Sequence, residues 1–115
     1  MATQVFIDYM LQAVVEQGAS DLRMIAGKPP RIFVGGEWKE LQAEALEPED
    51  TDSMMRQITA ERALRELDDE GLAVFGFAYG DNGFFMVGVA KKDGVVSLAL
   101  SRIGMPPHWT LTRAD

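Results

Sequence analysis

The chain has 115 residues, of which 47% are hydrophobic, and its 18 acidic and 11 basic residues give a formal net charge of −7. This length predicts one compact domain, because a single hydrophobic core usually serves about 100–150 residues. The acidic balance argues against a nucleic-acid partner, since phosphate binding depends on lysine and arginine. The lack of cysteine excludes a disulfide framework, a thiolate metal site and a cysteine nucleophile, and it suits a reducing cytoplasm.

The stretch from Gln4 to Gln17 has apolar residues three or four positions apart, which predicts a helix with one buried face. Thr3 can cap its start, and Gly18 can adopt the left-handed conformation that ends a helix. The stretch carries Asp8 and Glu16 and no basic leader. It is therefore predicted to be neither a signal peptide nor a membrane span.

Short runs rich in β-branched or bulky residues follow this helix and predict three strands: Leu22–Ile25, Arg31–Val34 and Glu37–Leu41. The first two are separated by Gly27-Lys28-Pro29-Pro30, whose prolines cannot donate the hydrogen bonds of a sheet. Gly35-Gly36 predicts a hairpin turn, since glycine accepts a positive φ angle at both positions. Trp38 is expected on the buried face of the last strand.

Two helices are predicted in the middle of the chain. The first begins at Pro48, which suits a first turn whose N–H groups are unpaired, and its apolar side is formed by Met54, Met55 and Ile58. The second is expected from Ala60 to Leu67, with Thr59 capping its start. The carboxylates of Asp68-Asp69-Glu70 would oppose the dipole at a helix end, so they are expected in the solvated turn beyond it.

Three apolar, aromatic or β-branched runs then predict an antiparallel meander: Leu72–Tyr79, Phe84–Ala90 and Val95–Arg102. The separators Gly80-Asp81-Asn82-Gly83 and Lys91-Lys92-Asp93-Gly94 contain the Asn-Gly and Asp-Gly pairs typical of tight hairpins. Residues 104–115, which include two prolines, are predicted to be a C-terminal linker after a domain of residues 1–103. This order of elements predicts an α+β fold, with helices packed on one face of an antiparallel sheet.

The sequence lacks the motifs of phosphate, metal and nucleophilic chemistry. Its one Gly-Lys pair, Gly27-Lys28, precedes Pro29, which has neither the hydroxyl nor the N–H that a phosphate loop needs. His108, the only histidine, lies in the predicted linker, which argues against a serine triad or a histidine zinc site. The acidic runs lack the spacing of a calcium loop. We therefore expect no catalytic residue, no bound cofactor and no metal in this chain.

Two groups of side chains have both an ordinary and a functional interpretation. Four phenylalanines could line a small-molecule pocket: Phe75, Phe77, Phe84 and Phe85. Phe75 and Phe77 share one face of a strand, so they are expected in the core first. Three arginines lie in or beside predicted strands of this acidic chain: Arg23, Arg31 and Arg102. Such arginines usually solvate a sheet edge or pair with nearby carboxylates, and binding to a partner surface is the alternative.

Two neighbouring motifs are Gly18-Ala19-Ser20-Asp21-Leu22-Arg23-Met24 and Gly27-Lys28-Pro29-Pro30. They resemble the N-terminal domain of the PilT family of pilus-retraction and secretion ATPases, which carries Gly-Ala-Ser-Asp-Leu-His-Leu, then Gly-x-Pro-Pro and a short hairpin. The later segment from Val74-Phe75-Gly76-Phe77 to Ile103 is similar to the closing meander of that family in order and spacing. The resemblance therefore covers nearly the whole chain.

The resemblance implies a PAS-like domain that, in the family, sits on an ATPase domain and helps to build a hexameric ring. The catalytic loop, the Asp and His boxes and the magnesium ligand of the family lie C-terminal to this domain, so ATP and magnesium would bind only through a further domain. The implied role is a non-catalytic assembly or regulatory domain of a type IV pilus or type II secretion ATPase, in the cytoplasm at the inner-membrane face of the machine. A stand-alone PAS-like adaptor or small-ligand sensor is the alternative.

The chain departs from the family pattern at positions where the family carries charge. Arg23 replaces a histidine, and Phe84 and Met86 replace the arginines of an Arg-Phe-Arg-Val-Asn strand. Those family arginines lie towards the nucleotide, where a guanidinium offsets phosphate charge, and Phe84 and Met86 cannot do so. We therefore expect a divergent domain kept for packing and assembly. Its expected interface residues are Asp21, Arg23, Pro29, Pro30, Arg31 and Arg102.

Overall fold

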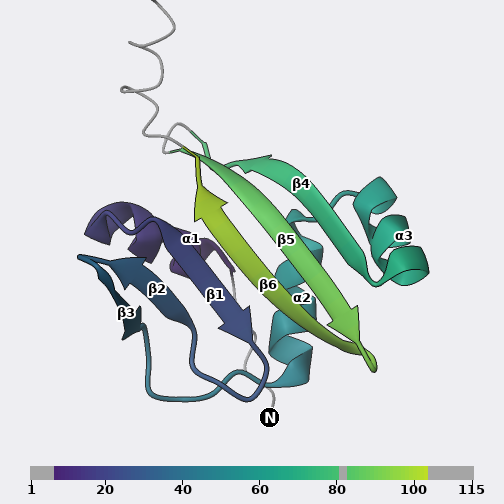
Figure 1. Ribbon diagram of the computed structural model, residues 1–115, viewed down its shortest axis with the longest axis horizontal. Coiled ribbons are helices and arrows are strands. Elements are labelled where there is room, and N and C mark those ends of the chain that lie inside the picture. The colour runs from purple at the N-terminus through teal and green to yellow at the C-terminus, as the bar shows by residue number, and fades with distance from the viewer. Residues whose placement is uncertain (1–6, 81–82, 104–115) are drawn as a thin grey trace, which may run out of the picture.

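The computed structural model describes residues 7–80 and 83–103, which form an antiparallel sheet with three helices (Figure 1). The helices are α1 (Ile7–Gln17), α2 (Pro48–Ile58) and α3 (Glu61–Glu70). The strands are β1 (Asp21–Ile25), β2 (Arg31–Val34), β3 (Glu37–Glu40), β4 (Leu72–Ala78), β5 (Phe84–Lys92) and β6 (Val95–Arg102). The expected α+β fold is confirmed, including the order of its elements.

The strands lie in the order β3-β2-β1-β6-β5-β4, and every neighbouring pair is antiparallel. Two meanders, β1-β2-β3 and β4-β5-β6, are thus joined along β1 and β6, where Leu22 stands opposite Leu100. In Figure 1, α1 and α2 lie behind the sheet and α3 lies beside β4, and no helix covers the face turned to the viewer. That face is left open to solvent.

The hydrophobic core lies between the helices and the sheet. Side chains alternate between the two faces of a strand, so every second residue of the central strands points at the helices. Phe85 shows the effect, since it is 0% exposed while the adjacent Phe84 is 46% exposed. The other large, fully buried side chains are Met10, Leu11, Leu22, Met24, Ile32, Leu46, Met54, Met55, Leu67, Leu98 and Leu100.

The junction between α2 and α3 differs from the prediction at Thr59. Its hydroxyl donates to the carbonyl oxygen of Met55 at 2.6 Å, so it closes α2 and does not cap α3. The residue before the first turn of α3 is Ala60, in an extended conformation. A threonine between two helices can satisfy a free carbonyl behind it or a free N–H ahead of it, and local sequence does not distinguish the two.

The prediction that Asp68-Asp69-Glu70 lies beyond the helix is wrong, because α3 continues through Glu70. Gly71 ends it with a φ of +77°, and its N–H donates to the carbonyl oxygen of Leu67 at 2.8 Å. An exposed carboxylate at a helix C-terminus costs only about 0.3–1 kcal/mol. Burial of Leu67 and the glycine cap outweigh that cost, and Asp68 also pairs with Lys91 at 3.1 Å.

Two hairpin turns are confirmed. Gly35 and Gly36 have φ angles of +64° and +85°, and Asp93 and Gly94 have +54° and +79°. Positive φ at both central positions matches the twist of two-residue hairpins. The second turn is tighter than predicted, because Lys91 and Lys92 belong to β5.

Some predictions concern residues outside the described ranges. They include the helix start with Thr3, the Asp81-Asn82 pair of one hairpin, and the linker of residues 104–115 with His108. Among the described helices, none is long and apolar enough to cross a membrane.

Candidate functional site

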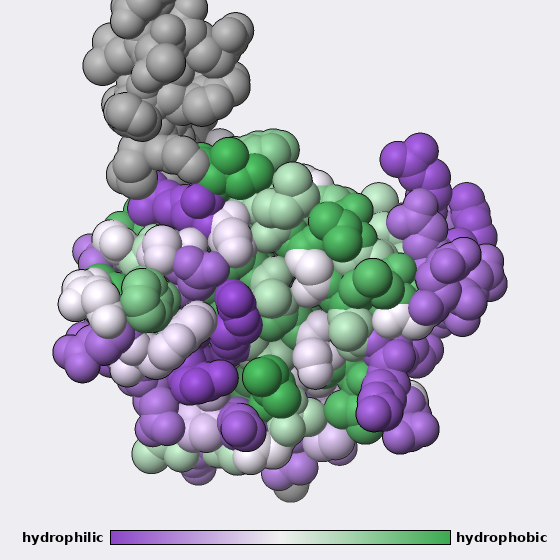
Figure 2. All heavy atoms as spheres, viewed as in Figure 1, coloured by the Kyte–Doolittle hydropathy of each residue, from purple (hydrophilic) through white to green (hydrophobic). Residues whose placement is uncertain are grey.

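The open face of the sheet, on the side away from the helices, is the candidate functional surface. Figure 2 views this face and shows hydrophilic residues gathered over β1 to β3 and hydrophobic residues over β4 to β6. Directly opposed residues of antiparallel strands share a face, so the strand register defines rows across it. One row crosses all six strands through Trp38, Phe33, Asp21, Ser101, Met86 and Gly76.

The hydrophilic half of the open face contains an arginine–tryptophan cluster, made of Asp21, Arg23, Arg31, Phe33 and Trp38. The guanidinium carbons of Arg23 and Arg31 lie 5.3 and 5.2 Å from the centroid of the Trp38 ring. Phe33 meets the same ring edge-on, with centroids 5.2 Å apart and planes at 65°. Both arginines thus pack on one indole.

Arg23 and Arg31 stand directly opposite each other on β1 and β2. Like charges in that position repel, so the arrangement needs compensation. The negative face of the indole attracts both guanidinium groups, and Asp21 accepts a bond from Arg23 Nη1 at 3.4 Å. The cluster therefore holds two cations in place at the surface of an acidic protein.

Trp38 was expected on a buried face, and that prediction is wrong, since the residue is 42% exposed. All four residues of β3 are exposed, and this strand forms one edge of the sheet. Its register opposite Phe33 places Trp38 on the open face, where Phe33 and the two arginines cover part of its ring.

The carboxylate of Asp21 is the best-connected group of the cluster. It accepts hydrogen bonds from the Ser20 hydroxyl at 2.7 Å and from the Ser101 hydroxyl at 2.8 Å, besides the contact with Arg23. Partial burial raises the pKa of Asp21, but these hydrogen bonds and the charge of Arg23 outweigh it and lower the pKa below the ordinary 3.8. Asp21 also ties β1 to β6 through Ser101.

The hydrophobic half of the open face contains an apolar stripe, made of Leu72, Val74, Phe84 and Met86, all of them exposed. Each of these large side chains stands opposite a small residue on the neighbouring strand: Ala90, Gly88, Ala78 and Gly76, respectively. The Phe84 ring lies so close over Gly76 that an added Cβ there would be 2.7 Å from its tip. Contiguous exposed apolar side chains on the surface of a folded domain are typical of an interaction site.

Comparison with known proteins gives the surface a context. No protein-family model matches the chain. The type IV pilus ATPase PilU of Pseudomonas aeruginosa is 29% identical over 94 residues, which cover 82% of this chain and 25% of PilU. The crystal structure of the pilus retraction motor PilT with bound ADP superposes with a TM-score of 0.79 at 29% identity, over 88% of this chain and 30% of PilT. The chain is a divergent relative of the N-terminal domain of PilT-type ATPases.

The fold of the chain is also similar to that of an ATPase other than PilT. The Legionella pneumophila ATPase DotB matches 90% of the chain with a TM-score of 0.73, and its 17% identity shows the shared fold alone. In each comparison the chain spans less than a third of its relative, about 25% of PilU and about 30% of PilT and DotB.

The fold brings together only some of the predicted interface residues. Asp21, Arg23 and Arg31 meet in the arginine–tryptophan cluster. The two prolines lie in the β1–β2 connection, where Pro30 is buried and its carbonyl accepts the N–H of Leu41 at 2.9 Å. Arg102 follows Ser101, so its side chain leaves the open face, and it packs against Gly83.

The structure also locates the four candidate phenylalanines and the acidic side chains. Phe85 is in the core, and Phe75 and Phe77 pack against it half-buried, whereas Phe84 lies on the open face. Within residues 7–80 and 83–103, no three histidine or acidic side chains gather into a metal-ligating group. Trp38 and the apolar stripe were not predicted to lie on the surface. The resemblance to the PilT family gave one signal for the stripe, since it placed Phe84 and Met86 at positions expected to carry arginine.

Changing Asp21 to asparagine should alter the pH dependence of stability. The pKa of Asp21 is lowered on folding, so its carboxylate stabilises the fold above pH 4 or so, and this contribution is lost as the pH falls through the folded-state pKa. The Asp21→Asn variant should therefore be less stable by about 1 kcal/mol at neutral pH. The difference should vanish in acid.

Urea unfolding of both proteins between neutral pH and about pH 3 measures this difference. Asp52→Asn is a suitable control, because Asp52 pairs with Arg56 on the solvent-facing side of α2. Loss of this exposed ion pair should change the free energy of unfolding little at any pH. A stability gap for Asp21→Asn that stays constant with pH would contradict the prediction.

Proposed function

We propose that this chain is a non-catalytic N-terminal domain of a type IV pilus or type II secretion ATPase, and that it contributes to subunit packing in a hexameric ring. The superposition on PilT carries the proposal, since it covers 88% of the chain at 29% identity but only 30% of the motor. PilU, a type IV pilus ATPase, supports the same assignment over 82% of the chain. ATP and magnesium would then be bound by a further domain, on the cytoplasmic side of the pilus or secretion machine.

The open face has the composition of a packing surface. The apolar stripe supplies exposed area that gains free energy when covered, and the adjoining arginine–tryptophan cluster supplies the residue types that dominate binding energy in protein interfaces. Arg23 and Arg31 are already held against Trp38. Such preordered side chains lose less conformational entropy when a neighbouring subunit docks.

The charge pattern suggests how the neighbour is oriented. The chain is acidic overall, at −7, yet this part of its surface presents two fixed guanidinium groups with one carboxylate between strands β1 and β6. A neighbouring subunit with carboxylates opposite the cluster and apolar side chains opposite the stripe could dock in only one orientation.

The test uses the full-length protein that is encoded by the open reading frame containing this chain. We expect a glycine-rich loop ending in Lys-Thr or Lys-Ser downstream, and we expect removal of residues 1–103 to shift the protein from hexamers to smaller species in analytical ultracentrifugation. A stop codon directly after the chain, or hexamers of unchanged stability after the deletion, would overturn the proposal.

A further inference from the structure

The outer edge of β4 is a second candidate surface, and it adjoins the apolar stripe of the open face. β4 is the last strand in the sheet order, and within the described residues it pairs only with β5. The Tyr79 N–H donates to the Gly83 carbonyl and the Lys91 N–H donates to the Gly71 carbonyl, both at 2.9 Å. Along an antiparallel strand, residues alternate between bonding to the neighbouring strand and pointing away from it, so these two bonds show which residues of β4 face β5. The main-chain groups that point away from β5 are those of Leu72, Val74, Gly76 and Ala78.

The sequence of β4 lacks the features by which edge strands usually resist pairing. β4 reads Leu-Ala-Val-Phe-Gly-Phe-Ala, without a charged residue or a proline. At the other edge of the sheet, β3 is four residues long, and Glu37, Lys39 and Glu40 are charged. Natural edges are commonly protected by short strands, charges or prolines. The β3 edge is protected in this way and the β4 edge is not.

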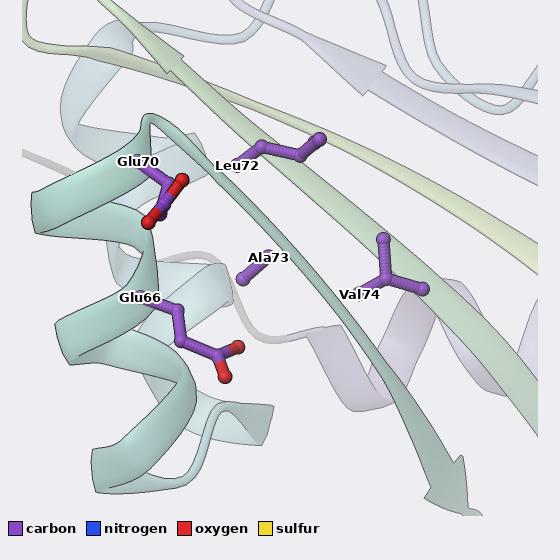
Figure 3. Close-up of a pocket in the computed structure, with 5 residues that line it drawn as sticks. All are labelled: Glu66, Glu70, Leu72, Ala73 and Val74. Carbon is purple, nitrogen blue, oxygen red and sulfur yellow. The ribbon is translucent and has the colours of Figure 1, made fainter.

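A cleft runs between this edge and α3. It encloses about 360 Å³ and is lined by Glu66, Glu70, Leu72, Ala73 and Val74. Figure 3 shows Glu66 and Glu70 extending from α3 towards β4, with Ala73 pointing to the helix side and Leu72 and Val74 away from it. The cleft therefore has one acidic wall and one wall of strand backbone.

The acidic wall is not neutralised within the domain. Neither Glu66 nor Glu70 has an ion-pair partner among the described residues, whereas Asp68 on the same helix pairs with Lys91. The last turn of α3 carries no basic residue, and the helix dipole adds partial negative charge at this end. A cationic side chain placed in the cleft would be attracted by both.

We propose that the β4 edge binds an extended basic segment of a partner protein, which adds to the sheet as a further antiparallel or parallel strand beside Leu72, Val74, Gly76 and Ala78. Side chains of an added strand alternate between two sides. Those on the helix side meet Glu66 and Glu70 and are lysine or arginine. Those on the other side extend the apolar stripe and are aliphatic.

A second copy of this chain fits the edge less well than a basic segment does. Pairing β4 with β4 of another copy would bring two sets of Glu66 and Glu70 to one junction, between chains that each carry a net charge of −7. The edge pairs through outward main-chain groups of β4, whereas the proposed subunit packing uses side chains of the open face, so the inference does not depend on that packing.

The experiment uses the 115-residue chain and a capped peptide of alternating lysine and valine, about seven residues long to match a typical strand. Amide hydrogen exchange followed by NMR should slow about tenfold or more at Val74, Gly76 and Ala78 when the peptide is added. The amides of Ala73, Phe75 and Phe77 should change little, because they already bond to β5. A peptide of alternating glutamate and valine should protect none of them.

Two variants test the parts of the site separately. Glu66→Gln combined with Glu70→Gln should weaken peptide binding about fivefold or more. The control, Glu44→Gln combined with Glu49→Gln, removes the same charge from exposed positions before and at the start of α2, and should leave affinity near the original. Val74→Pro removes an outward N–H without breaking a bond to β5, and should abolish protection along the edge.

Three results would overturn the inference. The first is binding of the lysine–valine peptide without protection of the outward amides. The second is equal loss of affinity in the Glu66/Glu70 variant and its control. The third is protection of the same amides in the chain alone with dimers in solution, which would make a second copy the occupant. The Glu66/Glu70 variant keeps the test valid if Val74→Pro does not fold.

Discussion

Replacing Phe85 by alanine should lower the free energy of unfolding by about 3–5 kcal/mol, while the same change at the adjacent Phe84 should cost about 1 kcal/mol or less. Phe85 is 0% exposed on β5, in the middle of the core. Its removal leaves a cavity that the surrounding strands and helices cannot fill. Phe84 lies on the open face, where its ring covers Gly76, and its loss exposes a surface that water already reaches.

Urea unfolding monitored by circular dichroism measures both variants under one condition. The pair is matched, because the two residues have the same side chain, the same strand and consecutive positions. Since a small domain has only about 5–15 kcal/mol of stability, Phe85→Ala should also show a much lower midpoint temperature. Equal costs at the two positions would contradict the assignment of the two faces of β5.

Met86→Asp should weaken association of the ATPase subunits about tenfold or more, if the open face packs against a neighbour as proposed. Met86 is 43% exposed in the middle of the apolar stripe. A carboxylate there would be buried without a partner on assembly. The isolated domain should lose only about 1 kcal/mol of stability, from the lower preference of aspartate for a strand.

The matched control is Tyr9→Asp, which introduces the same charge at a residue of α1 that is 61% exposed. It lies on the helix side of the sheet, so it should leave the dissociation constant near that of the unaltered protein. Sedimentation equilibrium of the ATPase-containing protein measures the association of both. Met86→Asp also leaves the β4 edge intact, so binding of the lysine–valine peptide should persist. An unchanged hexamer would argue against packing through this face.

The sequence alone was sufficient for features that depend on neighbours in the chain. The Gly35-Gly36 and Asp93-Gly94 turns follow from residues that tolerate positive φ, and the element order follows from hydrophobic periodicity. The motif from Gly18 to Met24 indicated the family that the comparisons then supported. These signals are local, so no knowledge of the packing was needed to find them.

Other predictions failed where two local solutions were available. Thr59 could bond ahead or behind, and it closes α2 because the Met55 carbonyl lies within its reach. The carboxylates of Asp68-Asp69-Glu70 remain in α3 because Leu67 must stay buried, and burial outweighs a modest dipole cost. Asp68 also pairs with Lys91, 23 residues further along the chain, and the local pattern does not reveal that contact.

The candidate surfaces were decided by the tertiary structure. The pairing of β1 with β6 brings together segments about eighty residues apart, as in the Ser101–Asp21 hydrogen bond, and period-two alternation does not specify which strands become neighbours. Trp38 is exposed because the pairing of β3 with β2 places it on the face that the helices leave uncovered, and β4 is an edge strand only because of its place in the strand order. The sequence by itself determined the elements, the turns and the family resemblance. Which face stayed uncovered and which edge stayed unpaired depended on non-local packing.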